Sequence, residues 1–264
     1  MTLDKIKCFL LDMDGTLYLG NHLIEGAVDA VSRMKNRARV LFVTNNSSTG
    51  AANYYKKLKN FGFELGLDDI YGSTRATIDY LREHHAGKRV FLCATEDVTE
   101  EFAAAGIILA GNRLCDAVPD IALLTFDKTM TYDKLQRFCA YLCRGALFIA
   151  THPDKVCPTA DGTIPDIGSF LKAIKCATSR KPDIICGKPY KAFGQSIIKM
   201  TGLKPYEIAM VGDRLSTDLK FAKNCGFVSV TVLSGEAKTA DIQKLKSPPD
   251  YVLGSIADWD KGEK

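Results

Sequence analysis

The chain has 264 residues, of which 46% are hydrophobic and 25% charged, and its 35 basic and 31 acidic residues give a formal net charge of +4. This is the composition of an ordinary globular protein that can bury a sizeable core, in one large domain or two smaller ones. No long block of like charges marks a surface for nucleic acid or membrane, so we expect neither as a partner.

The N-terminal residues lack a basic region followed by an uninterrupted apolar segment, and no stretch of the chain approaches the length of a membrane span. The nine cysteines are scattered without a CxxC pair, which is typical of reduced thiols rather than of a disulfide framework. We therefore expect an unexported, cytoplasmic protein.

Short apolar runs alternate with amphipathic stretches along nearly the whole chain, a pattern typical of parallel strands joined by crossover helices. The sequence therefore predicts an α/β fold with a doubly wound, mostly parallel, Rossmann-like sheet. In chain order, the expected strands are residues 6–11, 39–43, 89–93, 120–124, 146–150, 207–211 and 227–232. The expected helices are residues 26–36, 49–60, 75–85, 97–105, 131–143, 190–201 and 215–224, several of them followed by a glycine stop.

Ligands of open parallel sheets bind beyond the carboxyl ends of the strands, so the residues that follow each strand are candidate site residues. Four strand endings carry polar or charged groups that suit one chemistry. They supply Asp12 and Asp14; Thr44, Asn45 and Asn46; Lys188, after the short apolar run 184–186; and Asp213 and Asp218.

These four endings lie before about residue 50 and after about residue 185, whereas the endings around residues 90 to 150 carry nothing comparable. An inserted domain explains the asymmetry. We predict a catalytic core formed by residues 1–78 and 184–264, and an inserted α/β cap domain formed by residues 79–183. The inserted segment also offers a place for a homodimer contact.

Two carboxylates at the end of an apolar strand, Asp12 and Asp14, are costly unless a cation lies between them. Mg²⁺ takes hard oxygen ligands and usually combines one or two carboxylates with waters and substrate phosphate. With Lys188 as a cation and Thr44 as a hydroxyl, the set describes a phosphate clamp. One carboxylate can then attack phosphorus, while the second serves as acid and later as base.

The residues at these endings resemble the four motifs of the haloacid dehalogenase superfamily, most closely of its NagD-like, 4-nitrophenylphosphatase branch (subfamily IIA). The motifs occur in order, and the likeness covers almost the whole chain. They are Asp12-Met13-Asp14-Gly15-Thr16, Thr44-Asn45-Asn46-Ser47-Ser48, Gly187-Lys188-Pro189 and Gly212-Asp213-Arg214-Leu215-Ser216-Thr217-Asp218.

The resemblance implies a Mg²⁺-dependent phosphatase that hydrolyses small phosphomonoesters, such as a sugar phosphate or a nucleotide, through an aspartyl-phosphate intermediate. Asp12 would be the nucleophile and a metal ligand, and Asp14 the general acid/base with its backbone carbonyl on the metal. Thr44 would hydrogen-bond the transferring phosphoryl group, helped by the amide of Asn45. Lys188 would offset the negative charge that Asp12 shares with the phosphate.

The resemblance also implies that Asp213 is the third metal anchor and that Asp218 is a supporting carboxylate, reaching the metal directly or through water. Asn46 is counted with the phosphate-binding residues. Taken alone, Asp218 could instead cap the following helix. Two other functions stay open: phosphoryl transfer to an acceptor other than water, and a phospho-accepting or phosphate-binding regulatory module with little turnover, against which Asp14 argues.

His152 and Asp154 lie in the inserted segment on a proline-containing loop, where we expect a turn role or a substrate contact rather than direct catalysis. Residues 157–169 are expected to form a loop that leads to a helix and that a cap could lower over the leaving group. The NagD-like pattern has a small residue, usually Gly, where this chain has Asp166. The sequence does not name the phosphate ester.

Overall fold

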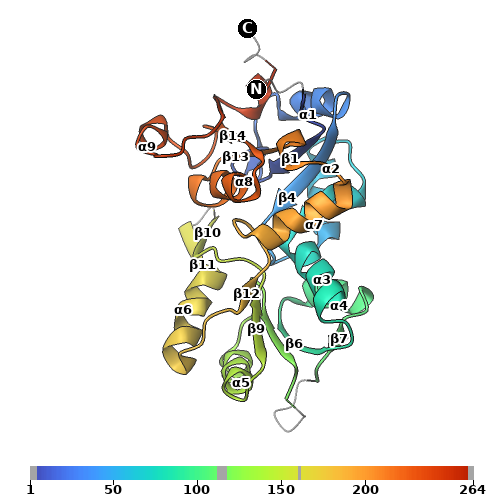
Figure 1. The fold of residues 1–264 in the computed structure, drawn as a ribbon, viewed down its shortest axis with the longest axis vertical. Helices are drawn as coiled ribbons and strands as arrows, with labels where there is room; N and C mark the ends of the chain where they lie inside the picture. The colour runs from blue at the N-terminus through green and yellow to red at the C-terminus, as the bar shows by residue number, and fades with distance from the viewer. Residues whose placement is uncertain (1–4, 112–117, 160–161, 261–264) are drawn as a thin grey trace. The chain divides into compact units, whose positions relative to one another are not determined.

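The computed structural model describes residues 5–111, 118–159 and 162–260. The chain divides into two compact units, shown in Figure 1 with the chain coloured from blue to red. The first unit consists of residues 1–44, 51–71 and 188–264, and the second of residues 45–50 and 72–187. Each unit contains a parallel sheet of its own, and the predicted α/β class is confirmed.

The first unit is built on a six-stranded sheet with β1 (Cys8–Asp12) near its middle. The printed sequence shows near-continuous apolar runs at these strands because both faces of such a sheet are covered. The order is β15 (Tyr251–Leu253), β14 (Val228–Val232), β13 (Ile208–Gly212), β1, β4 (Arg39–Thr44) and β5 (Ile70–Gly72). The helices are α1 (Ala27–Lys35), α2 (Ala51–Asn60), α7 (Lys191–Thr201), α8 (Lys220–Cys225) and α9 (Thr239–Ile242).

The register of the first sheet brings three strand endings to one edge. β1 pairs in parallel with β4, where Asp12 lies opposite Val43, and with β13, where Leu11 lies opposite Val211. Side chains that follow these strands therefore meet beyond the carboxyl ends of β1, β4 and β13, as the sequence predicts.

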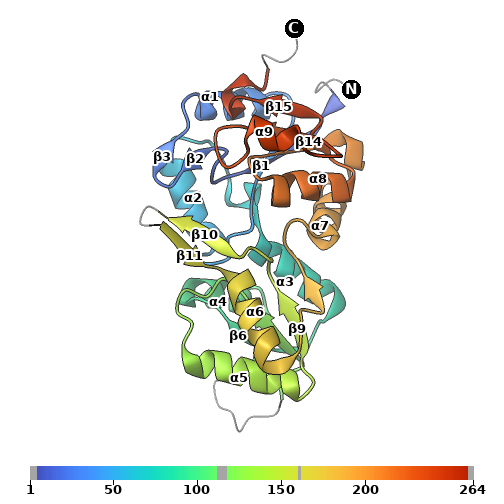
Figure 2. The same ribbon diagram turned by 90° about the vertical axis from the view of Figure 1, so that its left-hand side faces the viewer.

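Helices cover both faces of this sheet, with α1 and α2 on one side and α7 and α8 on the other (Figure 2). On the first side, Phe9 of β1 packs edge to face on Trp259, with ring centroids 5.6 Å apart. On the second side, the rings of Phe193 in α7 and Phe221 in α8 pack edge to face, with their centroids 5.4 Å apart. Large aromatic side chains dominate such cores because each buries a large apolar area.

The second unit contains a five-stranded sheet in which all neighbouring strands pair in parallel. Alternate strand residues face opposite sides: Phe91 and Phe148 pack with α5 and α6, and Val90 and Leu123 with α3 and α4. The sheet order is β12 (Ile184–Ile185), β9 (Leu147–Ala150), β8 (Ile121–Leu124), β6 (Arg89–Cys93) and β7 (Ile108–Leu109), and the helices are α3 (Ser73–His84), α4 (Glu96–Ala104), α5 (Tyr132–Cys143) and α6 (Ile167–Thr178).

An antiparallel hairpin, β10 (Val156–Thr159) and β11 (Gly162–Pro165), precedes α6 in the second unit. The expectation of a loop over residues 157–169 is therefore wrong. The hairpin residues are mostly exposed, so their sequence lacks the apolar alternation that marks a half-buried strand. A second hairpin, β2 (Tyr18–Leu19) and β3 (His22–Leu23), follows β1 and is too short to show any periodicity.

The part of the chain that the structure describes has no helix with the length and apolarity needed to cross a membrane.

Candidate active site

Asp12 is the last residue of β1, and a sharp turn follows it. The carbonyl oxygen of Met13 accepts a hydrogen bond from the N–H of Leu17 at 2.8 Å. Gly15 has a φ of 89°, and a Cβ at this position would overlap the carboxylate of Asp213. The Gly of the first motif is thus required both by its left-handed backbone and by its close approach to another motif.

Lys188 lies between two of the acidic residues and is only 2% exposed. Its Nζ donates to Asp12 Oδ1 at 2.5 Å and to Asp218 Oδ1 at 2.7 Å. The Lys188–Pro189 peptide bond is cis, and Asn224 Nδ2 donates to the carbonyl oxygen of Pro189 at 2.8 Å. The lysine therefore joins the first and the last motif.

The chain after β13 places Asp213 and Asp218. Asp218 lies in a π-helical turn, Leu215–Leu219, and its Oδ2 accepts a hydrogen bond from the N–H of Arg214 at 3.1 Å. Single π-helical turns are frequent at functional sites. Asp213 Oδ2 accepts from the N–H of Glu236 at 2.7 Å, whereas its Oδ1 is buried and has no hydrogen-bond partner among the described residues.

Asp12, Asp213 and Asp218 form a cluster, each with a carboxylate oxygen within 4.8 Å of one from the others. Burial raises the pKa of Asp12 well above its ordinary value against the opposing charge of Lys188, and the other two carboxylates raise it further. Burial and the charge of Asp218 raise the pKa of Asp213 to about 6. Burial by itself would lower the pKa of Lys188, but the two carboxylates that it contacts raise it. One ammonium therefore faces three carboxylates.

The cluster fits a hard divalent cation. The unpaired, buried oxygen of Asp213 is costly unless a ligand satisfies it. Carboxylate oxygens are the protein ligands that Mg²⁺ prefers. Glycine keeps the space around these oxygens open, because a Cβ at Gly212 would overlap Asp218 and a Cβ at Gly235 would overlap Asp213.

Asp14 and Thr44 lie at the same edge of the first sheet. Asp14 is exposed and forms an isolated backbone bridge with Tyr18. Its side chain is not part of the carboxylate cluster. Thr44 is the last residue of β4, one position beyond the residue that pairs with Asp12. An exposed carboxylate can exchange protons with solvent, which suits the acid and base role predicted for Asp14.

Asn45 and Asn46 belong to the second unit. Asn45 Nδ2 donates to Asp154 Oδ2 at 3.1 Å, and Asn46 Oδ1 accepts from the N–H of Ser48 at 2.9 Å. Both side chains are thus oriented by contacts within their own unit. Their phosphate-binding roles stay predictions.

Residues 234–237, which follow β14, also contact the site, although the sequence did not predict this. Ser234 Oγ donates to the carbonyl oxygen of Gly15 at 2.8 Å, and the N–H of Ala237 donates to the carbonyl oxygen of Asp213 at 3.0 Å. This segment also follows a predicted strand, which was an available signal. It contributes mainly backbone groups, and a sequence pattern of ligand and nucleophile side chains does not indicate such groups.

Comparisons with known proteins agree with this geometry. Residues 9–108 match a family described as haloacid dehalogenase-like hydrolase, and residues 185–259 match one described as HAD-hydrolase-like. The chain is 31% identical to the sugar-phosphatase AraL of Bacillus subtilis over 253 residues. The matched region covers 96% of this chain and 91% of that protein.

Two solved structures are similar over nearly the whole chain. The 4-nitrophenylphosphatase of Thermotoga maritima is 40% identical, with a TM-score of 0.92 and 98% of both chains covered. The glycerol phosphate phosphatase of Mycobacterium tuberculosis, solved in complex with magnesium, is 30% identical with a TM-score of 0.90, covering 98% of this chain and 78% of that one.

Proposed function

Since the chain belongs to the haloacid dehalogenase-like hydrolases, as a phosphatase of the NagD-like branch, we propose that it cleaves small phosphomonoesters through an aspartyl-phosphate on Asp12. The observation that carries this proposal is the position of Asp12, bonded to Lys188 and clustered with Asp213 and Asp218 at the edge of the sheet. The cofactor is Mg²⁺, which the carboxylate cluster fits.

The reaction has two steps. A carboxylate oxygen of Asp12 attacks phosphorus in line while the bond from phosphorus to the ester oxygen breaks, and Asp14 gives its proton to the leaving alkoxide. Asp14 then takes a proton from water, which attacks the phosphorus of the aspartyl-phosphate. Inorganic phosphate leaves, and the carboxylate of Asp12 is restored.

The surrounding residues neutralise and position the phosphoryl group. Held by Asp12, Asp213 and Asp218, Mg²⁺ would offset the charge on the phosphoryl oxygens. Lys188 favours the ionised form of Asp12, which attacks phosphorus, because its ammonium contacts the carboxylate directly and opposes the rise in its pKa that burial causes. Thr44, with Asn45 and Asn46, would donate hydrogen bonds to the phosphoryl oxygens, and such fixed donors stabilise charge without reorganisation.

The substrate class and the cap are the finer parts of the proposal. The name of the sugar phosphatase relative supports a sugar phosphate, and a nucleotide is the other class expected from the sequence. We propose residues 79–183 as the cap domain that selects the leaving group. A panel of phosphate esters tests this: Asp166→Gly should change the ranking of substrates, beyond any loss that all the esters share, and an unchanged ranking would contradict it.

Nucleophilic attack by Asp12 is tested with 4-nitrophenyl phosphate, with and without Mg²⁺. Asp12→Asn should lower kcat by at least about a thousandfold, because the amide cannot attack phosphorus. Asp29→Asn, at an exposed position of α1, is the matched control and should keep full activity. Wild-type turnover in Asp12→Asn would falsify the assignment.

The fate of labelled phosphate separates the remaining functions. Label in inorganic phosphate supports hydrolysis, whereas label in an added sugar or nucleotide acceptor would mean phosphoryl transfer. A stable aspartyl-phosphate without product release would mean a regulatory module. A cytoplasmic location is also proposed, supported by the eight free cysteines among the described residues.

A further inference from the structure

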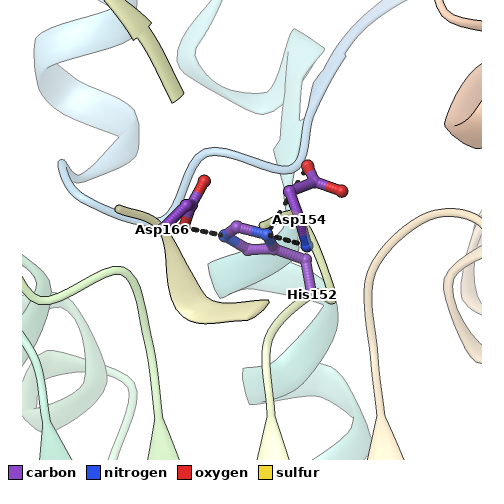
Figure 3. Close-up of side chains that lie close together, drawn as sticks. All are labelled: His152, Asp154 and Asp166. Atoms are coloured by element: carbon purple, nitrogen blue, oxygen red, sulfur yellow. Dashed lines mark hydrogen bonds and ion pairs between the residues drawn. The ribbon is translucent and has the colours of Figure 1, made fainter. Parts of the chain in front are cut away.

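The second unit contains a buried group of titratable side chains in which the imidazole of His152 lies between two carboxylates (Figure 3). His152 is 0% exposed and Asp166 is 4% exposed. Nδ1 of His152 lies 3.6 Å from Asp154 Oδ2, and Nε2 lies 3.7 Å from Asp166 Oδ1. The carboxylates therefore face opposite nitrogens of one ring.

The imidazole bridges the two carboxylates. The three residues offer ligand atoms within 4.8 Å of one another, so a metal ion is the other occupant that the experiments below must separate from a bridging role. The N–H of Asp154 donates to Nδ1 at 3.4 Å, so Nδ1 acts as a hydrogen-bond acceptor. Nε2 is buried without a hydrogen-bond partner among the described residues and faces Asp166.

The bridge closes the base of the hairpin formed by β10 and β11. Asp154 precedes the hairpin and Asp166 follows it, so His152 contacts both of its ends. Backbone hydrogen bonds close the same point: the N–H of Asp166 donates to the carbonyl oxygen of Lys155 at 3.1 Å, and that of Gly168 to the carbonyl oxygen of Asp154 at 2.7 Å. The hairpin thus has a base fixed by both backbone and side-chain contacts.

The same carboxylate that faces His152 also orients a residue of the second motif. Asp154 Oδ2 accepts the hydrogen bond from Asn45 Nδ2 at 3.1 Å. Beside it, Ser47 Oγ and Thr151 Oγ1 lie 2.8 Å apart in a buried hydrogen bond. A Cβ at Gly187 would come within 2.8 Å of Asn45 Oδ1, so the surroundings of this amide are tightly packed.

We propose that His152 is a positioning residue of this phosphatase: it lies between the two ends of the hairpin and, by accepting the hydrogen bond from the N–H of Asp154, holds that residue where its carboxylate orients Asn45. The inference rests on the proposed role of Asn45 in binding the phosphoryl group. Without the imidazole, the N–H of Asp154 loses its acceptor, and Asp154 is free to turn away from Asn45. Binding of the phosphoryl group then weakens whatever the leaving group is.

The first experiment measures KM and kcat for 4-nitrophenyl phosphate and the competitive inhibition constant of inorganic phosphate, in the presence of Mg²⁺. His152→Gln should raise both KM and the inhibition constant about three- to tenfold, as expected for a misplaced hydrogen-bond donor, and change kcat less. Asp166→Asn, which keeps a capping side chain at the start of α6, should show a smaller rise. Asp133→Asn removes an exposed partner of Arg137 in the same unit and is the control that should change neither constant.

A double-mutant cycle tests whether His152 acts through Asn45. If it does, His152→Gln should add almost nothing to the inhibition constant in an Asn45→Ala background, because the residue that it positions is gone. Additive effects of the two substitutions would overturn the inference. If His152→Gln does not fold, Asp154→Asn at a less buried position takes its place in the cycle.

Two further results would overturn the inference. One is a lower unfolding temperature in His152→Gln with unchanged KM and inhibition constant, which would mean a structural role only. The other is stoichiometric Zn²⁺ or Mn²⁺ binding that His152→Gln abolishes and Asp213→Asn does not. Failure of the proposed function shows differently, as full activity in Asp12→Asn.

Discussion

The site of the first unit is defined by an imbalance of charge: of three clustered carboxylates, two bond one buried ammonium. Asp12 and Asp218 each bond Lys188, whereas Asp213 keeps a buried oxygen without a partner among the described residues. A lysine that contacts two carboxylates can hold both in place but cannot neutralise a third. The imbalance explains why a divalent cation belongs in this set.

Binding of Mg²⁺ should depend on pH through Asp213, whose pKa burial and Asp218 raise to about 6. A protonated carboxyl is a poor ligand, so the affinity should fall about tenfold per unit as the pH drops below that value. Isothermal titration calorimetry between pH 5 and 7, in two buffers of different ionisation enthalpy, measures the affinity and the proton release. A constant affinity without proton release would contradict the prediction.

Without metal, the same group has the opposite effect on stability. The pKa of Asp213 is raised from the ordinary 3.8 to about 6, so its contribution to stability is full below 3.8 and is lost as the pH rises through about 6. Metal-free protein should therefore gain stability on mild acidification, and Asp213→Asn should reduce that gain in urea denaturation experiments. An identical pH dependence in both proteins would exclude this role.

The long strands were predicted from the sequence, and of the short ones only β12 lies in a run, residues 184–186, that was counted among the strand endings. The helix α6 was expected only as the helix to which residues 157–169 lead. All seven expected strands are present within one or two residues, because buried parallel strands have continuous apolar runs. The strands β5, β7, β12 and β15 have two or three residues, too few to show any period. The hairpin of β10 and β11 is mostly exposed, and its sequence is typical of a polar loop. The sequence therefore did not predict its two strands.

The start of α4 anchors the segment 45–50 within the second unit. Asp97 accepts hydrogen bonds from the hydroxyl of Thr49 at 2.7 Å, the N–H of Gly50 at 2.9 Å and the hydroxyl of Thr95 at 2.7 Å. Burial alone would raise the pKa of Asp97, but these hydrogen bonds lower it to about 2. A short motif segment is thus tied to a helix that begins almost fifty residues later.

Asp97→Asn should lower the free energy of unfolding by about 1 kcal/mol at neutral pH, because an amide accepts fewer of these hydrogen bonds. The lowered pKa makes the contribution of Asp97 full above 3.8 and lost as the pH falls towards 2. The difference between the two proteins should therefore narrow over that range. Urea denaturation measures the free energy of unfolding of both proteins, with Asp133→Asn as the control. A difference in that free energy that stays the same at low pH would contradict the prediction.

Across the whole chain, the two units differ in what they contribute to metal binding. All three clustered carboxylates and Lys188 belong to the first unit, as does Trp259, the single tryptophan of the sequence. Trp259 is 2% exposed and packs on Phe9 of β1. Its fluorescence therefore reports the unfolding of the unit that carries the proposed metal ligands.

Mg²⁺ should raise the unfolding temperature seen by tryptophan fluorescence, and EDTA should reverse the change. A ligand at a hundred times its Kd stabilises the folded state by about 2.7 kcal/mol, which corresponds to a shift of a few degrees. Asp213→Asn should lose the shift. A transition that moves with Mg²⁺ in circular dichroism but not in fluorescence would mean that the ion binds elsewhere.

The sequence alone dictates the α/β class, the four polar strand endings and their suitability for Mg²⁺ and phosphate, because these depend on local patterns and on the chemistry of each side chain. Only the tertiary structure decides that Lys188 bonds Asp12 and Asp218, residues 176 and 30 positions away, and that one oxygen of Asp213 has no hydrogen-bond partner in the described part of the chain. It likewise decides that His152 lies between Asp154 and Asp166. Such contacts follow from strand register and from the burial of charged groups, which no local pattern in the chain records.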